Sequence, residues 1–366
     1  MLEDDARPHR VPHPFTHDSI EDFHRVPEHT RYSRKVLRAR IYSETLEYEE
    51  LLKPRTIALL ARYQLELVLA VRPWDVEALP NVARTLRDAG VPLSVWPMLS
   101  DEEGRWASVH NANSFGAFVL RLCDALEDAP ARDVLIDLEP PFAQARSLAK
   151  MGAGESKNPD GLARFANGLS KSAAPVFDAA GKALAKTVGE VHARGLTTSM
   201  AVWPLVALDP PGEKAWQTLL GTPVDPLGTG HVSVMMYTSI FEGWSRGACR
   251  RRDARALLAA ATIRTVKRWG DRAGMSLGCV GTGAFEDEPV YRDPSELAED
   301  VAIVRAAGCS QLSLFDFGGV LKREPAEAWL DAFVSSAATT SAEDSKRVRA
   351  ARTLARTVTW ALGKPR

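Results

Sequence analysis

The feature that most constrains the fold is a regular alternation of strand-like and helix-like segments between residues 36 and 335. Short apolar segments typical of buried strands alternate with amphipathic segments typical of helices, and several helical segments end at a glycine, such as Gly90, Gly195 and Gly308. Near-continuous apolar strands indicate a parallel sheet that is covered by helices. Eight such units in about 300 residues predict an α/β fold, a single closed (β/α)8 TIM barrel.

The pattern also predicts the individual segments. Strands are expected over 36–44, 65–73, 91–99, 133–139, 196–205, 231–240, 275–285 and 309–320. Helices are expected over 48–64, 76–89, 114–126, 160–194, 214–220, 253–271, 294–307 and 325–335. A doubly wound open sheet is the alternative, but no glycine-rich phosphate-binding motif follows the first strand.

Two segments lie outside the alternation, and the barrel is expected over 36–340. Residues 1–35 carry histidines among prolines and charged residues, which predicts an irregular N-terminal arm; a metal-binding tail is the alternative. Residues 341–366 are basic, with apolar residues at helical spacing. They predict an extra C-terminal helix packed on the barrel, or alternatively a helix that binds a partner or a membrane surface.

Charge and cysteine content narrow the classes of ligand. A formal net charge of −1 argues against nucleic acid as the main partner. The four cysteines form no close pair with metal-ligand spacing, so we expect neither zinc nor disulfides, and no cofactor. No apolar run is long enough to span a membrane, and no signal peptide precedes the barrel, so a cytoplasmic protein is expected if Met1 is the native start.

Two carboxylates end the fourth expected strand. Because strand side chains alternate, Asp137 and Glu139 share one face with Leu135, while Val134 and Ile136 share the other. One interpretation is a structural ion pair beside a solvated loop carboxylate. The other is a general acid, Glu139, with a helper carboxylate, and both burial and the charge of Asp137 are then expected to raise the pKa of Glu139.

The other strand ends are rich in carboxylates and aromatic side chains, and the active sites of such barrels lie at the carboxyl ends of the strands. The candidates for substrate binding there are Glu44, Arg72, Trp74, Trp96, Trp203 and Asp316, with Tyr237 and Glu286 at the sixth and seventh ends. Carboxylates with flat aromatic walls suit carbohydrate, because sugar rings stack on aromatic faces while hydroxyls meet polar groups. We therefore expect a carbohydrate substrate or ligand.

The segment Ile136–Asp137–Leu138–Glu139–Pro140–Pro141 resembles the end of the fourth-strand motif of family 18 glycoside hydrolases, the chitinase-like barrels. Met235–Met236–Tyr237 is similar to the Met-x-Tyr of that family's sixth strand. The resemblance implies that Glu139 is the general acid, that Asp137 orients a substrate N-acetyl group that attacks the anomeric carbon, and that Tyr237 holds its oxygen. The sequence departs from the motif at three positions: Leu135 replaces an aspartate, Pro140 an aromatic residue, and Thr238 the usual Asp or Asn.

Three alternatives to this mechanism remain open. Retaining glycosidase barrels place an acid on strand four and a nucleophile on strand seven, which would be Glu139 and Glu286. A non-catalytic barrel could keep the groove for carbohydrate binding alone. A metal-dependent lyase, isomerase or hydrolase could use the five oxygen ligands Glu44, Asp137, Glu139, Glu286 and Asp316.

Overall fold

A computed structural model describes residues 38–129, 131–152, 173–210, 212–283 and 285–335, together with Ser345, Val348, Arg349 and Thr353. The expected N-terminal arm over residues 1–35 lies outside the described residues. Most of the expected C-terminal helix over 341–366 lies outside them as well.

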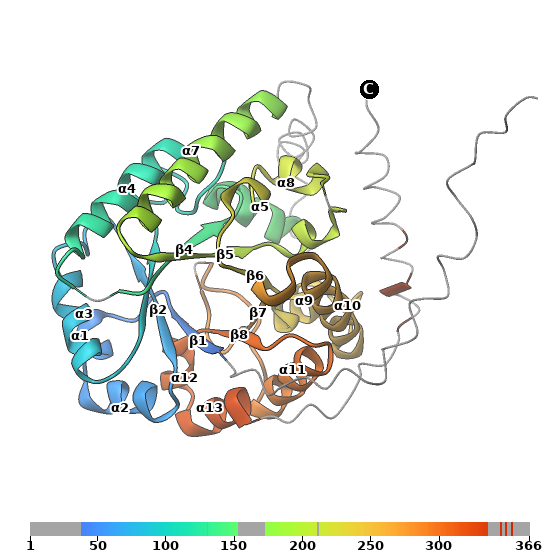
Figure 1. The fold of residues 1–366 in the computed structure, drawn as a ribbon. Coiled ribbons are helices and arrows are strands. Elements are labelled where there is room, and N and C mark those ends of the chain that lie inside the picture. The colour runs from blue at the N-terminus through green and yellow to red at the C-terminus, as the bar shows by residue number, and fades with distance from the viewer. Residues whose placement is uncertain are drawn as a thin grey trace, which may run out of the picture. The chain divides into compact units, whose positions relative to one another are not determined.

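Eight parallel strands close into one barrel in the order of the sequence (Figure 1). Each strand pairs with the next, and the eighth pairs with the first, so the predicted single (β/α)8 barrel is confirmed. The strands are β1 (Arg38–Ser43), β2 (Glu66–Val71), β3 (Leu93–Pro97), β4 (Asp133–Leu138), β5 (Thr197–Val202), β6 (His231–Met235), β7 (Ala273–Gly278) and β8 (Gln311–Phe315).

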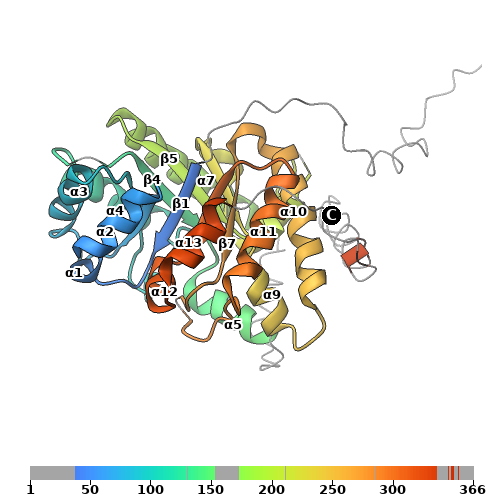
Figure 2. The ribbon, with the colours of Figure 1, turned by 90° about the horizontal axis from the view of Figure 1, so that it is seen from below.

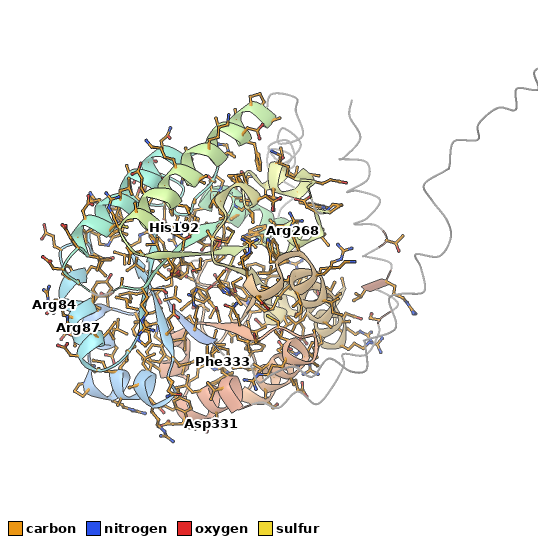
Figure 3. The ribbon with its side chains drawn as sticks, viewed as in Figure 1. Arg84, Arg87, His192, Arg268, Asp331 and Phe333 are labelled. Carbon is orange, nitrogen blue, oxygen red and sulfur yellow. The ribbon has the colours of Figure 1, made fainter. Side chains whose placement is uncertain are left out.

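Helices surround the strands as an outer layer (Figures 1 and 2). The α-helices are α1 (Tyr48–Leu51), α2 (Pro54–Arg62), α3 (Leu79–Asp88), α4 (Ala112–Ala125), α5 (Phe142–Gly152), α7 (Ala173–Ala193), α8 (Ala215–Leu220), α9 (Thr238–Trp244), α10 (Arg251–Trp269), α11 (Pro294–Ala306), α12 (Phe317–Lys322) and α13 (Ala326–Ser335). Short 3-10 helices are η3 (Pro204–Leu208), η4 (Asp225–Leu227) and η5 (Gly270–Arg272). Charged side chains such as Arg84 and Arg87 of α3 point away from the barrel (Figure 3).

The alternation of strand side chains separates two apolar clusters. Val134, Ile136 and their equivalents on other strands point outward and pack against the helices. Leu135 points inward, where it packs with Tyr42 and Trp96 at the centre of the barrel. The predicted face of Leu135, and hence of Asp137, is the interior of the barrel.

The amino-terminal end of the barrel interior is filled by a buried ion-pair network. The guanidinium of Arg40 lies 2.9 Å from Glu66 and 3.4 Å from Asp133, and donates a hydrogen bond of 2.9 Å to the hydroxyl of Ser199. Buried charges are tolerated only when they are paired and hydrogen-bonded in this way. The network fills that end of the interior, which leaves the carboxyl ends of the strands for a ligand.

Several expected strands end earlier than predicted, because local chemistry starts a helix or loop. The expected strand 309–320 ends at Phe315, since the side chain of Asp316 accepts a hydrogen bond from the Gly319 amide and caps α12. The expected strand 231–240 ends at Met235, and α9 begins at Thr238. The expected strand 275–285 ends at Gly278 and continues as a loop. The expected helix 48–64 is divided into α1 and α2, the second of which begins at a proline, a residue favoured at the first position of a helix.

Candidate functional site

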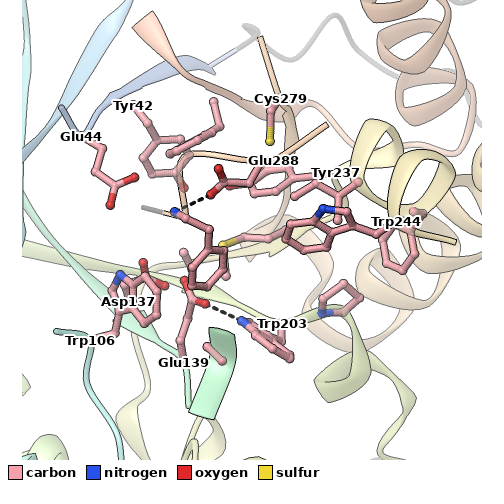
Figure 4. A pocket seen from close by; sticks show the side chains of 18 of the residues that line it. Tyr42, Glu44, Trp106, Asp137, Glu139, Trp203, Tyr237, Trp244, Cys279 and Glu288 are labelled. Atoms are coloured by element: carbon pink, nitrogen blue, oxygen red, sulfur yellow. Dashed lines mark hydrogen bonds between the residues drawn. The ribbon is translucent and has the colours of Figure 1, made fainter. Parts of the chain in front are cut away.

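A cavity of about 390 Å³ lies at the carboxyl ends of the strands (Figure 4). Its walls combine carboxylates with aromatic rings, and no Lys, Arg or His is among the residues that line it in the described part of the chain. The carboxylates are Glu44, Asp137, Glu139 and Glu288, and the aromatic residues are Tyr42, Trp96, Trp106, Trp203, Tyr237, Phe241, Trp244, Phe285 and Phe315.

Asp137 is the most deeply placed of these carboxylates, with 1% of its surface exposed. Neither of its carboxylate oxygens has a hydrogen-bond partner among the described residues. Burial raises its pKa well above the ordinary value, and the charges of Glu139 and Glu44 raise it further. The side chain of Glu139 raises this pKa and that of Trp96 lowers it. A buried carboxyl group without a partner is costly in the free protein, and it is available to a bound ligand.

Glu139 follows β4 directly and points into the same cavity (Figure 4). Burial raises its pKa to about 7, whereas a hydrogen bond from the indole nitrogen of Trp203, 2.5 Å away, acts in the opposite direction. Asp137 also lowers the pKa of Glu139, which differs from the expectation that both burial and Asp137 would raise it. The two carboxyl groups share one buried site, so the first proton lost from the pair leaves Glu139 ionised beside a protonated Asp137.

Glu44 enters the cavity from the end of β1 and is paired with an arginine from the loop after β3. Its carboxylate lies 3.0 Å from the guanidinium of Arg105, which Asp101 holds through two further nitrogens at 2.8 and 2.9 Å. Burial raises the pKa of Glu44 to about 7 even though the charge of Arg105 lowers it. Arg105 therefore places and partly neutralises Glu44, a role that the sequence pattern did not reveal.

The loop after β7 contributes Glu288 to the cavity. Glu288 is buried and accepts hydrogen bonds from the amides of Gly283 (3.1 Å) and Phe285 (3.0 Å). Glu286, which was expected to end a longer strand, is exposed and is not among the residues that line the cavity. The expected strand was too long, and the three acidic residues 286–288 in the sequence were the signal that a carboxylate of this loop could face inward.

Aromatic rings contact one another around the cavity. Tyr42 meets Trp96 edge to face with ring centroids 5.2 Å apart, and Tyr237 stacks on Phe315 at 5.5 Å. The indole nitrogens of Trp96 and Trp106 are buried without a hydrogen-bond partner among the described residues. Flat apolar faces beside unsatisfied donors and acceptors match the mixed character of a sugar, which has apolar ring faces and a polar edge.

The position after Tyr237 serves the fold rather than the cavity. The side chain of Thr238 donates to Asp300, which also accepts a hydrogen bond of 2.9 Å from the hydroxyl of Tyr291. Arg251 lies 3.1 Å from Asp300 and donates to Thr238. An aspartate at position 238, one of the two residues usual in the family 18 motif, would stand next to the buried Asp300, which is a local electrostatic reason against that residue.

The remaining predicted substrate-binding residues are not among those that line the cavity. Trp74 is 66% exposed and lies against the guanidinium of Arg72, which is paired with Asp101 at 2.9 Å. Asp316 is buried as the cap of α12, and burial raises its pKa to about 6. The predicted residues that do line the cavity together are Glu44, Trp96, Asp137, Glu139, Trp203 and Tyr237.

The carboxylates do not converge in the manner of a metal centre. Within the described ranges, no three His, Cys, Asp or Glu side chains are grouped closely enough to hold a metal ion. Of the five oxygen ligands proposed for a metal, Glu286 is exposed and Asp316 caps a helix. In the same ranges no helix is both long and apolar enough to cross a membrane.

Known proteins resemble this chain only at low sequence identity. No protein-family model and no curated protein matches the sequence. Solved structures with a similar fold include the PgaB (BpsB) glycoside hydrolase domain from Bordetella bronchiseptica, with a TM-score of 0.48 and 13% identity, covering 84% of this chain and 100% of that chain. A chitinase from Chromobacterium violaceum has a TM-score of 0.45 and 12% identity, covering 83% of this chain and 100% of that chain. D-allulose 3-epimerase from Methylomonas sp. has a TM-score of 0.44 and 11% identity, with coverages of 82% and 96%.

Proposed function

We propose that this barrel is a glycoside hydrolase, with Glu139 as the general acid and Asp137 as its assisting carboxylate. The observation that carries the proposal is the state of Glu139: it faces an aromatic cavity with a pKa of about 7 and is held by the indole of Trp203. A general acid works best when its pKa lies near the working pH, since it is then protonated and still a ready donor.

In the substrate-assisted form of this mechanism, the ligand supplies the nucleophile. The unpartnered carboxyl oxygens of Asp137 accept the N–H of a 2-acetamido group, and Tyr237, which lines the same cavity, holds the carbonyl oxygen. The acetamido oxygen attacks the anomeric carbon while Glu139 gives its proton to the departing glycosidic oxygen. The unsatisfied buried carboxyl group of Asp137 supports this form, because such a group gains most from a ligand donor.

A two-carboxylate retaining form is the second candidate mechanism. The position of Glu288 in the cavity supports it, because Glu288 comes from the loop after β7, where retaining barrels carry the nucleophile. Its carboxylate accepts hydrogen bonds from two backbone amides, which hold it in place at the cavity. This mechanism gives the role first expected of Glu286 to Glu288.

The test is Glu139→Gln on a panel of aryl glycosides with and without a 2-acetamido group. The amide keeps the shape of the side chain but cannot deliver a proton, so we expect kcat to fall by about 10²- to 10⁴-fold with binding nearly unchanged. Binding of a glycan by the wild type without any turnover would instead support the non-catalytic barrel. Turnover that requires an added divalent metal and vanishes with a chelator would support the metal-dependent alternative. No turnover and no binding of any glycoside would refute the carbohydrate proposal.

A further inference from the structure

An aromatic bridge crosses the mouth of the barrel. Phe285, from the loop after β7, stacks on Phe142 at the start of α5 with ring centroids 5.4 Å apart. The same ring meets Trp106, from the loop after β3, at 6.4 Å and Trp244 of α9 at 6.3 Å. In a closed barrel of eight strands, β3 and β7 are four strands apart in either direction and lie opposite each other. The contact between Trp106 and Phe285 therefore joins opposite sides of the mouth.

Polar contacts fix both ends of this bridge. On one side Glu288 accepts the amides of Gly283 and Phe285, which holds the loop that carries the ring. On the other side the guanidinium of Arg105 lies 4.4 Å from the centroid of Phe142, and Asp101 and Glu44 hold that guanidinium in place. Several aromatic contacts of about 0.5–1.5 kcal/mol each stabilise the bridge. Hydrogen bonds to Glu288 and the guanidinium of Arg105 hold it at its two ends.

The bridge forms part of the wall of the catalytic cavity. Trp106, Phe285 and Trp244 line the same space as Asp137 and Glu139. The volume of the cavity, about 390 Å³, is near the lower end of the range for small-molecule pockets. A cavity of this volume holds about one or two sugar rings. A polysaccharide cleaved at an internal bond needs a groove that is open on both sides of the acid. Rings that meet across the mouth occupy space that a chain continuing on both sides of the acid would need.

We infer that the site takes the end of a glycan chain or a small glycoside, and that Phe285 is the residue that excludes internal segments of a polymer. This inference rests on the proposed carbohydrate function and adds its substrate class. The ring of Phe285 acts by occupying space that a continuing chain would need, so its removal frees that space. An aromatic replacement keeps that space filled.

The experiment measures how glycan affinity and cleavage depend on the length of the glycan chain in the wild type, Phe285→Ala and Phe285→Tyr. The probes are N-acetylglucosamine oligosaccharides and cello-oligosaccharides of one to six sugars, with glycol chitin and carboxymethylcellulose as polymers. For the wild type and Phe285→Tyr, affinity should stop rising after the second sugar, and polymer viscosity should stay constant while chain-end sugars are released. For Phe285→Ala, polymer viscosity should fall while sugars are released, because internal cleavage shortens the polymer, and affinity should continue to rise beyond the second sugar.

A second variant keeps the test valid if Phe285→Ala lowers the yield of folded protein. Trp244→Ala opens the same bridge from α9, and thermal unfolding shows which variants retain the fold. Internal cleavage by the wild type, or affinity that rises steadily to six sugars, would overturn the inference while leaving the glycosidase proposal intact. Oligosaccharide binding without turnover would refute the catalytic proposal. The dependence of affinity on chain length would still test the inference about Phe285. No binding of any probe would refute both.

Discussion

The indole nitrogen of Trp203, at the end of β5, donates a hydrogen bond to the carboxylate of Glu139, at the end of the neighbouring strand β4. The two residues meet because parallel strands bring their carboxyl ends to the same edge of the barrel. The donor stabilises the ionised form of Glu139, while burial favours the protonated form, and the pKa of about 7 results from both.

Replacing Trp203 by Phe should therefore move the pH profile. A smaller aromatic ring replaces the indole and the donor is lost, so the ionised form of Glu139 is less stable and its pKa rises above about 7. A general acid must be protonated, so kcat/KM declines as pH rises through that pKa, and this decline should shift to higher pH in the variant. The pH dependence of kcat/KM on the best aryl glycoside measures it. Trp244→Phe, in the same cavity, is the control, and its kcat/KM should decline at the same pH as that of the wild type. If kcat/KM of Trp203→Phe declined at the wild-type pH or at a lower pH, this account of Glu139 would be contradicted.

The two carboxylates of the loop after β7 should behave differently. Glu288 lines the cavity and Glu286 is exposed, so Glu286→Gln is a matched control with the same chemical change in the same loop. If the retaining mechanism operates, Glu288→Gln should lower kcat as strongly as Glu139→Gln, with partial rescue by azide. If the mechanism is substrate-assisted, Asp137→Asn should be severe and azide should not rescue Glu288→Gln. Steady-state rates with and without azide separate the two. A loss in Glu286→Gln that matched Glu288→Gln would show that the loop, and not the cavity carboxylate, is responsible.

The free energy of unfolding should decrease as pH rises, because Glu44 is more easily deprotonated in the unfolded chain than in the folded protein. Its pKa rises from an ordinary 4.5 to about 7 in the folded protein, so between these values the folded state binds more protons than the unfolded state. The stabilisation is present below about pH 4.5 and is lost as pH rises through about 7, at about 1.4 kcal/mol per pH unit for one such group. Glu44→Gln should make this slope shallower in denaturant unfolding measured from pH 4.5 to 7.5. Equal slopes in the two proteins would mean that Glu44 titrates normally.

The network around Asp300 should matter for folding and not for chemistry. Asp300 is fully buried and accepts hydrogen bonds from Thr238 and Tyr291 beside Arg251. Asp300→Ala leaves the guanidinium of Arg251 without this partner and should lower the free energy of unfolding by about 3–5 kcal/mol. The exposed neighbour Glu299 is the control, and Glu299→Ala should change stability by less than about 1 kcal/mol. Urea unfolding measures the free energy of unfolding of both variants. A similarly small loss of this free energy in the two would refute a structural role for Asp300.

The sequence by itself determined the barrel and the centre of the site. Apolar strands alternating with helices allow few architectures, and period-two alternation sets Asp137 on the inner face of β4 from local pattern alone. Tyr237, Trp96 and Trp203 were predicted from the expected carboxyl ends of their strands, and all three line the cavity. Glu286 was expected at the site because the strand was extended too far, and strand ends depend on capping contacts such as that of Asp316 with Gly319.

Only the tertiary structure decided how the site is closed and charged. The bridge of Phe285 with Trp106 joins loops from opposite strands, and Arg105 meets Glu44 from a distant part of the chain. The sign of the effect of Asp137 on Glu139 depends on which carboxyl group is more deeply buried and keeps its proton. These properties are set by distances and by burial, which residue types and their spacing do not encode locally.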